Sequence, residues 1–268
     1  MWLVIGGRSF ALGSFFILMT NYNATSPALA PLLVIIPAWN EEETVASVVS
    51  EARRACGCDV VVIDDASTDD TVARARGAGA IVLPLRLQLK SWGATQAGLR
   101  YALKYGYRTV ITMDADGQHE AASLPALLEP LGDGRADVVI GAYPERGSRA
   151  RKITWTFFRK FTGLSHEDLT SGLRAYNREA ITVLAAHAAT LLEYQDLGVL
   201  LLLRRAGLRI KEVPVTMNLR ETGKSRIFHS WFQVFFYLLH TGILCLAKIG
   251  RSARCEKLVS PPAPPRRG

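Results

Sequence analysis

Residues 31–65 read PLLVIIPAWNEEETVASVVSEARRACGCDVVVIDD, and this stretch contains the pattern that decides the fold. A short, continuous apolar run at residues 32–36 ends at Pro37, as expected of a strand buried on both faces of a parallel sheet. A helix is predicted over residues 41–55, and a second apolar run at residues 60–63 predicts the next strand. The stretch therefore has the strand–helix–strand order that joins neighbouring parallel strands.

The same alternation continues along the chain. Further strands are predicted at residues 80–83, 109–113 and 137–141, with helices at residues 69–78, at residues 91–105 and from Ser123 onward. Alternating strands and helices imply right-handed crossovers and a doubly wound, mostly parallel sheet of the α/β class. Ligands of such sheets bind beyond the carboxyl ends of the strands, so we expect the functional site at that edge.

Length, composition and charge limit the class of protein. The 268 residues are 49% hydrophobic and 21% charged, which is typical of one large globular domain and argues against a disordered chain or a multi-span membrane protein. The net charge is +8 and is uneven: residues 1–130 carry 10 Lys and Arg against 13 Asp and Glu, and residues 131–268 carry 22 against 11. We expect the basic half to face membrane lipid or a phosphorylated substrate rather than nucleic acid.

Spacing excludes several familiar sites. The four cysteines form no Cys-x-x-Cys pair and have no His at zinc-ligand spacing, so we interpret them as reduced thiols of a reducing compartment: Cys56, Cys58, Cys245 and Cys255. No Gly-x-Gly-x-x-Gly follows the first strand, which leaves a dinucleotide-binding domain unsupported. The sequence Gly223-Lys224-Ser225 is not a phosphate-binding P-loop, because Asn218 stands where that motif needs glycine.

Both ends of the chain are predicted to lie outside the sheet domain, which we assign to residues 31–226. Residues 1–30 include an apolar stretch at residues 10–19, which is shorter than the about 20 residues that span a bilayer. We interpret this segment as a loosely ordered or membrane-touching extension. A secretory signal cleaved after Ala28-Leu29-Ala30 is the alternative.

Residues 227–250 are predicted to form an amphipathic, membrane-associated helix. Residues 227–247 contain no Asp, Glu, Lys or Arg, and their number just permits a span. Polar side chains recur there at three- and four-residue intervals, which favours a helix lying in the membrane interface over one that spans. Packing on the domain's own core or on another subunit is the alternative. Residues 251–268 are predicted to be a disordered, basic, Pro-rich tail, and the protein is expected at the cytoplasmic face of the membrane, peripheral or monotopic.

A pair of carboxylates, Asp114 and Asp116, follows the strand predicted at residues 109–113, with Gln118 close behind. Clustered anions repel each other unless a cation joins them. Hard oxygen ligands suit Mg²⁺ or Mn²⁺, which typically combine a few protein oxygens with substrate phosphates. A capped turn with solvated acids is the alternative for Asp-x-Asp alone, but the position at the end of a strand favours a metal site.

A second acidic segment, residues 64–69, ends the strand predicted at residues 60–63. Asp, Ser and Thr in such a place either cap the following helix or bind a ligand. We assign Thr68 and Asp69 to capping, and Asp65 to contact with a nucleobase or ribose.

Five blocks of sequence, in this order, resemble the family 2 glycosyltransferases of GT-A fold. They are VIIPAWNEE at 34–42, VIDDASTD at 62–69, MDADGQH at 113–119, DLTSGLRAY at 168–176, and EVP at 212–214 followed by Arg220 and GKSR at 223–226. The resemblance is closest to the non-processive group typified by dolichyl-phosphate mannose synthase and other polyprenyl-phosphate glycosyltransferases. It covers about residues 32–226.

The resemblance implies roles for individual positions. Those that match donor-binding positions are Pro37, Trp39, Glu41, Ile63, Asp65, Ala115 and Asp116, with Arg146 a looser match for a phosphate ligand. Asp114, Asp116 and Gln118 match positions around the divalent metal. Arg220 and Arg226 match the catalytic basic pair in the loop that closes over the diphosphate, where cations stabilise the charge of the leaving nucleoside diphosphate.

Asp196 lies about where inverting members of the family keep their catalytic carboxylate. The alternative is an acid that stabilises the dipole at a helix start. A sugar hydroxyl acceptor must lose a proton during attack, so a carboxylate base assists it. A phosphate monoester has a second pKa of about 6 and is mostly dianionic at pH 7, so it needs cations more than a base.

The sequence thus predicts an inverting, non-processive, metal-dependent glycosyltransferase that uses a UDP- or GDP-linked nucleotide sugar and a membrane-held polyprenyl phosphate. No Gln-x-x-Arg-Trp follows the fourth block, and the polymerising members of the family carry that motif. The alternatives are a glycan or glycolipid hydroxyl as acceptor, a sugar nucleotidyltransferase, and a catalytically inactive donor-binding membrane module. The nucleotidyltransferase is disfavoured because its Gly-rich loop after the first strand is absent.

Overall fold

The structure is a computed structural model that describes residues 2–5, 8–11, 31–143, 168, 171–190 and 197–218. Within the predicted N-terminal extension, β1 (Trp2–Ile5) and β2 (Arg8–Ala11) pair as an antiparallel two-stranded sheet. Several predictions lie outside the described residues: Arg146, Asp196, Arg220, Arg226, the helix at residues 227–250 and the tail at residues 251–268.

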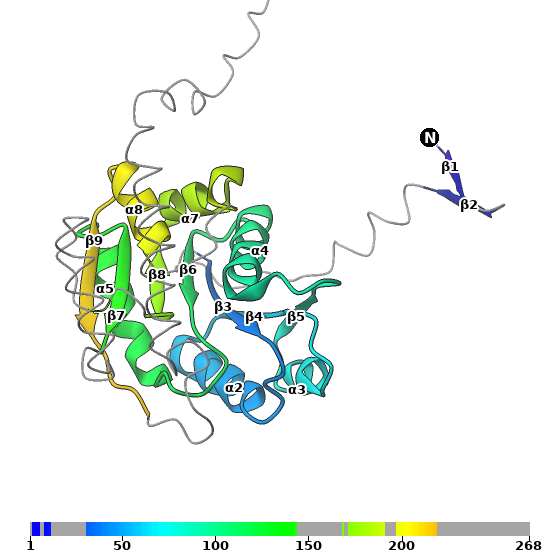
Figure 1. The fold of residues 1–268 in the computed structure, drawn as a ribbon, viewed down its shortest axis with the longest axis horizontal. Helices are drawn as coiled ribbons and strands as arrows, with labels where there is room; N and C mark the ends of the chain where they lie inside the picture. Colours follow the sequence, from blue (N-terminus) through cyan, green and yellow to red (C-terminus); the bar gives the residue numbers. More distant parts are fainter. Residues whose placement is uncertain are drawn as a thin grey trace, which may run out of the picture.

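The domain is built on a seven-stranded sheet with the order β5-β4-β3-β6-β8-β7-β9 (Figure 1). Its strands are β3 (Leu32–Ala38), β4 (Asp59–Asp64), β5 (Ile81–Pro84), β6 (Thr109–Thr112), β7 (Val138–Ala142), β8 (Arg174–Tyr176) and β9 (Ile210–Pro214). Every pairing is parallel except those of β8, which runs antiparallel to both β6 and β7. The predicted mostly parallel sheet is confirmed.

Helices cover both faces of the sheet, as Figure 1 shows for α4 and α7 on one side and α2 and α3 on the other. The helices are α2 (Val45–Cys56), α3 (Thr71–Gly77), α4 (Lys90–Lys104), α5 (Leu124–Gly132), α7 (Arg178–Ala185) and α8 (Leu197–Arg205), with 3₁₀ turns η1 (Ala121–Ser123) and η3 (His187–Ala189). Because side chains alternate along a strand, Leu33 and Ile35 of β3 enter the core beneath α4, α7 and α8. Val34 and Ile36 enter the core beneath α2, α3 and α5. The predicted doubly wound arrangement is confirmed.

The strand β8 was not expected from the sequence. It has only three residues, too few to show the apolar run or the alternation by which a strand is recognised. Its register pairs Arg174 with Thr112 of β6 and with Ile140 of β7. Since β8 is antiparallel to its neighbours, the residues just before Arg174 lie at the carboxyl end of β6, which is where Asp114 follows.

The start of α3 differs from the expected capping by Thr68 and Asp69. The N-cap residue is Asp70, without a side-chain cap hydrogen bond. Asp69 precedes the N-cap, and its Oδ1 accepts a hydrogen bond from the Thr71 N–H at 3.0 Å. Thr68 does not cap the helix; its N–H donates instead to Asn40 Oδ1 at 2.9 Å, across the loop that follows β3. Among the described helices, none combines the length and apolar character that a bilayer crossing needs.

Three elements are joined where β7 begins, at Asp137. Its Oδ2 accepts from the Arg209 N–H at 2.8 Å and from Arg209 Nε at 3.0 Å, and its Oδ1 accepts from Asn177 Nδ2 at 3.0 Å. Arg209 directly precedes β9, and Asn177 caps α7 by accepting from the Ala180 N–H at 2.9 Å. Hydrogen bonds from Arg209 lower the pKa of the Asp137 carboxyl, with burial acting in the opposite direction.

We expect Asp137→Asn to lower the free energy of unfolding by about 1–3 kcal/mol at pH 7, because an amide cannot accept every hydrogen bond that the carboxylate accepts. The lowered pKa means that the wild-type advantage is fully present above about pH 3.9, the ordinary Asp value, and is lost as the pH falls through the folded-state pKa. Urea denaturation over a pH series measures both effects. Asp133→Asn is the control: this carboxylate is 54% exposed and pairs at the surface with Arg135, so its loss should change stability by less than about 1 kcal/mol. An unchanged unfolding midpoint in Asp137→Asn would contradict the role given to this network.

Candidate functional site

The carboxyl ends of β3, β4 and β6 meet at one edge of the sheet. The Asp65 N–H, after β4, donates to the Ala38 carbonyl of β3 at 2.8 Å. The Thr44 hydroxyl, after β3, donates to the Ala115 carbonyl after β6 at 2.7 Å. The segment that follows β3 is thus hydrogen-bonded to the segments that follow β4 and β6. The three polar segments that the sequence places after these strands therefore lie next to one another.

The predicted donor-binding positions after β3 differ in exposure. Trp39 is 41% exposed at the end of the strand. Glu41 is half-buried, and its N–H donates to the Thr71 hydroxyl of α3 at 2.9 Å. Pro37 pairs in register with Ile63 of β4, whose side chain is fully buried in the core. The Ile63 side chain therefore lies in the core, whereas the Trp39 side chain is exposed, and donor contacts at both positions stay predictions.

Asp65, the donor-binding acid predicted after β4, is only 4% exposed. Its Oδ1 accepts a hydrogen bond from the Leu89 N–H at 2.6 Å, so the carboxylate holds the loop that leads into α4. Its neighbour Asp64 is equally buried and accepts from the Ser67 N–H at 3.3 Å. Both acids have structural contacts, and the nucleotide contact of Asp65 stays a prediction.

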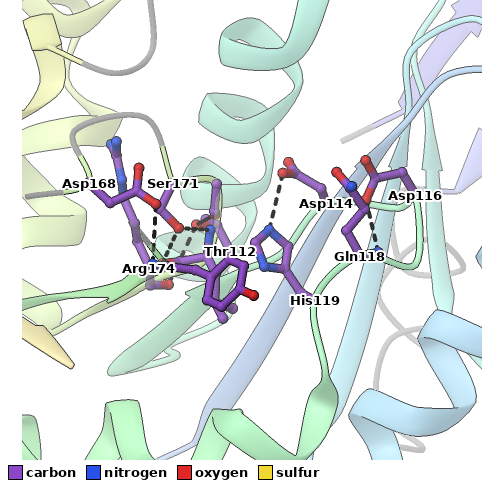
Figure 2. A network of polar contacts seen from close by, with 11 residues as sticks. Thr112, Asp114, Asp116, Gln118, His119, Asp168, Ser171 and Arg174 are labelled. Atoms are coloured by element: carbon purple, nitrogen blue, oxygen red, sulfur yellow. Dashed lines mark hydrogen bonds and ion pairs between the residues drawn. The ribbon is translucent and has the colours of Figure 1, made fainter. Parts of the chain in front are cut away.

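Asp114, the first acid after β6, is paired with a histidine. His119 Nε2 lies 3.3 Å from Asp114 Oδ2, and the exposed fractions of the two side chains are 1% and 40% (Figure 2). Because an ionised carboxylate only accepts hydrogen bonds, Nε2 carries the proton that faces it. The other ring nitrogen, Nδ1, is buried and has no hydrogen-bond partner in the described part of the chain. The imidazole therefore orients one oxygen of Asp114 from the protein interior.

On another side, the Asp114 carboxylate packs against the backbone of Gly172. A Cβ built on Gly172 would lie 2.6 Å from Asp114 Oδ1 and would overlap Oδ2. The Gly172 carbonyl is itself held by the Thr112 hydroxyl, which donates to it at 2.9 Å. His119 and Gly172 were not predicted as site residues, because membership of the matching blocks is the only signal that they carry in the sequence.

Asp116 and Gln118 belong to the same tight loop. The Gln118 N–H donates to Asp116 Oδ1 at 3.2 Å across Gly117, whose φ of +73° is a conformation that favours glycine. The loop is also hydrogen-bonded to the segment that follows β9. The Asn218 N–H donates to the Gln118 carbonyl at 2.8 Å, and His119 and Met217 form an isolated antiparallel β-bridge. Asn218 is close in sequence to Arg220, which is predicted to bind the diphosphate and lies outside the described residues.

The oxygen donors here fit a divalent hard cation. Asp114, Asp116 and Gln118 are each half-buried, and together they offer two carboxylates and an amide oxygen. In the described ranges no three His, Cys, Asp or Glu residues gather as a complete ligand set. Two carboxylates and an amide oxygen, without Cys or His ligands, do not fit a closed zinc site. They fit Mg²⁺ or Mn²⁺, which use one or two carboxylates and take further oxygens from water and substrate phosphate.

The fourth and fifth blocks of the sequence meet beside this cluster. Asp168 is fully buried; its N–H donates to Glu212 Oε1 at 2.9 Å, and its Oδ2 accepts from the Tyr143 N–H at 3.3 Å. Figure 2 draws Asp168, Ser171 and Arg174 on one side of Thr112 and the metal-binding candidates on the other. Arg174 is 1% exposed. These buried polar residues fix the segment that places Gly172 against Asp114.

Relatives of known name are similar over most of the chain. An undecaprenyl-phosphate mannosyltransferase of Micrococcus luteus is 34% identical over 213 residues, which are 73% of this chain and 87% of that protein. A polyprenol monophosphomannose synthase of Mycolicibacterium smegmatis is 31% identical, over 73% of this chain and 80% of the relative.

Solved structures agree on the fold. Glucosyl-3-phosphoglycerate synthase from Mycobacterium tuberculosis, in complex with phosphoglyceric acid, is 25% identical with a TM-score of 0.62 and covers 79% of each chain. Another complex of that enzyme, with Mn²⁺, UDP-glucose and phosphoglyceric acid, has a TM-score of 0.60 at 25% identity over 79% of each chain. The family model described as glycosyl transferase family 2 matches residues 33–188. The chain therefore belongs to glycosyl transferase family 2, as its five sequence blocks predict.

Proposed function

We propose that this protein transfers a sugar from a nucleotide-diphosphate donor, UDP- or GDP-linked, to a membrane-held polyprenyl phosphate, with inversion and without chain elongation. The observation that carries this proposal is the cluster of Asp114, Asp116 and Gln118 beside the ends of β3 and β4. The names of the two relatives, both of which refer to a polyprenyl phosphate or polyprenol, support the acceptor. We place the reaction at the cytoplasmic face of the membrane, with the protein bound as a peripheral or monotopic enzyme.

Asp114, Asp116 and Gln118 are the residues that would hold Mg²⁺ or Mn²⁺. A bound divalent ion neutralises negative charge that develops on the departing nucleoside diphosphate. The protein contributes a fixed arrangement of oxygens: His119 and Gly172 hold the Asp114 carboxylate from two sides. Groups that are already oriented need no reorganisation when charge develops, which is why such an arrangement favours the transition state.

The remaining donor contacts are assigned from the ends of the strands. The exposed ring of Trp39 offers an aromatic surface for the nucleobase. Arg220 and Arg226 are proposed to bind the diphosphate, since guanidinium groups make paired contacts with phosphate. The hydrogen bond from the Asn218 N–H to the Gln118 carbonyl supports this assignment, because it ties the start of the arginine-bearing segment to the acidic loop.

The acceptor is assigned by its chemistry. A phosphate monoester is already an anion at pH 7, so it needs positive charge and positioning more than a base. The excess of 22 Lys and Arg over 11 Asp and Glu in residues 131–268 supports an anionic acceptor, and Arg146 is proposed as one of its ligands. A hydroxyl acceptor is the second candidate, favoured by the structural likeness to an enzyme solved with UDP-glucose and phosphoglyceric acid rather than with a lipid.

Membranes that contain the protein, incubated with radiolabelled UDP- and GDP-sugars, should transfer label into an organic phase as a mild-acid-labile lipid. We expect Asp116→Asn to lower this transfer by about 100-fold or more, because transition-state charge stabilisation is lost. Asp133→Asn, a surface substitution of the same kind, should transfer as the wild type does. Release of pyrophosphate instead of nucleoside diphosphate would identify a nucleotidyltransferase and contradict the proposal.

Gly172→Ala should displace the Asp114 carboxylate, because the added methyl group overlaps its oxygens. We expect Mn²⁺ to bind about tenfold more weakly in the presence of UDP or GDP, in line with the effect of disturbing the support of metal ligands. Electron paramagnetic resonance of free Mn²⁺ measures this without turnover. Gly132→Ala, at a glycine with open space around it, is the control. Unchanged Mn²⁺ affinity in Gly172→Ala would remove Asp114 from the ion's ligands.

Asp196→Asn separates the two candidate acceptors. With a polyprenyl phosphate acceptor we expect most of the turnover to remain, because the attacking oxygen carries no proton. With a hydroxyl acceptor the loss of a general base should cost about 100-fold or more in kcat. The measurement is kcat with each class of acceptor for the wild type and the variant. Near-normal kcat on a hydroxyl acceptor would exclude Asp196 as the base.

A further inference from the structure

The loop between β5 and α4 carries the most exposed large apolar side chains of the described residues. Residues 86–89 of this loop and Lys90, the first residue of α4, read RLQLK, and all five are exposed. Leu87 is 75% exposed and Leu89 is 49% exposed. Single exposed leucines are common on protein surfaces and need no explanation. Two exposed leucines on one short segment, each next to a basic residue, form an apolar and basic surface. We call this segment, residues 86–90, the docking loop.

The base of the docking loop is held firmly, so the exposure of its leucines is not a result of a loose connection. On one side, the Leu85 N–H donates to the Asp64 carbonyl at 2.8 Å. On the other, the Leu89 N–H donates to Oδ1 of the buried Asp65 at 2.6 Å. A Cβ on Gly93 would lie 2.5 Å from the Leu89 Cβ, so this glycine lets the base of Leu89 pack on the first turn of α4.

The charges of the docking loop fit an anionic surface. Arg86 and Lys90 are exposed on either side of the two leucines, and residues 85–91 contain no Asp or Glu. Apolar side chains that enter the acyl region, flanked by cations at headgroup level, are the combination that binds proteins to anionic membranes.

We propose that the docking loop binds an anionic lipid bilayer, with Leu87 and Leu89 inserted among the lipids and Arg86 and Lys90 at the headgroups. Since the loop is bonded to Asp64 and Asp65, this contact turns the carboxyl edge of the sheet toward the membrane. The proposal rests on the proposed function for its biological meaning, because a lipid-linked acceptor then meets the site from the membrane side.

The test is co-sedimentation of the full chain with vesicles of phosphatidylcholine, alone or mixed with phosphatidylglycerol. We expect Leu87→Ser to weaken binding to the mixed vesicles about tenfold, the loss that removal of one inserted leucine predicts. Leu89→Ser should weaken binding to the mixed vesicles by a smaller factor, since the Leu89 side chain is less exposed than that of Leu87. Tyr105→Ser is the matched control: Tyr105 is 46% exposed, but it follows the carboxyl end of α4, away from the loop. Its binding should equal that of the wild type.

Two further variants, Arg86→Gln and Lys90→Gln, test the contribution of the positive charges. Each should weaken binding to phosphatidylglycerol vesicles about fivefold and leave binding to phosphatidylcholine unchanged. Arg76→Gln, at an exposed arginine in the last turn of α3, is the control and should bind as the wild type does. Unfolding midpoints equal to that of the wild type establish that every variant is folded.

Two results would overturn the proposal. One is unchanged vesicle binding in Leu87→Ser and Leu89→Ser, which would leave the contact to another part of the chain. The other is an equal loss of affinity for free UDP or GDP in the absence of vesicles, which would assign the loop to the donor site. Vesicle binding needs no turnover, so a protein that binds through this loop but transfers no sugar would reject the proposed function and keep the docking loop.

Discussion

The Asp114 carboxylate lies in a space that exists because residue 172 has no side chain. That contact depends on β8, the one antiparallel strand of the seven-stranded sheet, which brings the chain back to the carboxyl end of β6. The Thr112 hydroxyl then fixes the Gly172 carbonyl, and His119 holds the carboxylate from the interior. Three features therefore orient the Asp114 carboxylate: the antiparallel strand β8, the absence of a side chain at Gly172 and the buried imidazole of His119. The rest of the site depends on this orientation.

Much of the fold follows from the sequence because the buried strands have a strong local pattern. The apolar runs that became β3 and β4, and the acids that end β4 and β6, are visible without any tertiary information. The strand β8 is not, since three residues carry no period, and its place is set by pairing with two distant strands. For the same reason Asp114 was predicted as a site residue but its supports were not: the contacts with His119 and Gly172 arise only when the chain has folded.

Hydrogen bonds at the carboxyl edge join segments that are far apart in the sequence. The Asp168 N–H binds Glu212, the Asn218 N–H binds the Gln118 carbonyl, and the Thr44 hydroxyl binds the Ala115 carbonyl. Sequence segments that are far apart in the chain thus support a common surface. Substrate positioning contributes strongly to group transfer, and small displacements of reacting groups are costly. Under the proposed function, these hydrogen bonds would keep several loops at fixed separations around the donor.

The opposite edge of the sheet serves a different need. There the Asp137 network ties the starts of β7, α7 and β9 together, away from the acids that follow β6. Changes that act on separate, distant sites are close to additive. This separation makes the amino edge a suitable place to engineer a more heat-resistant protein, because substitutions that strengthen it should be nearly additive with changes made at the candidate site.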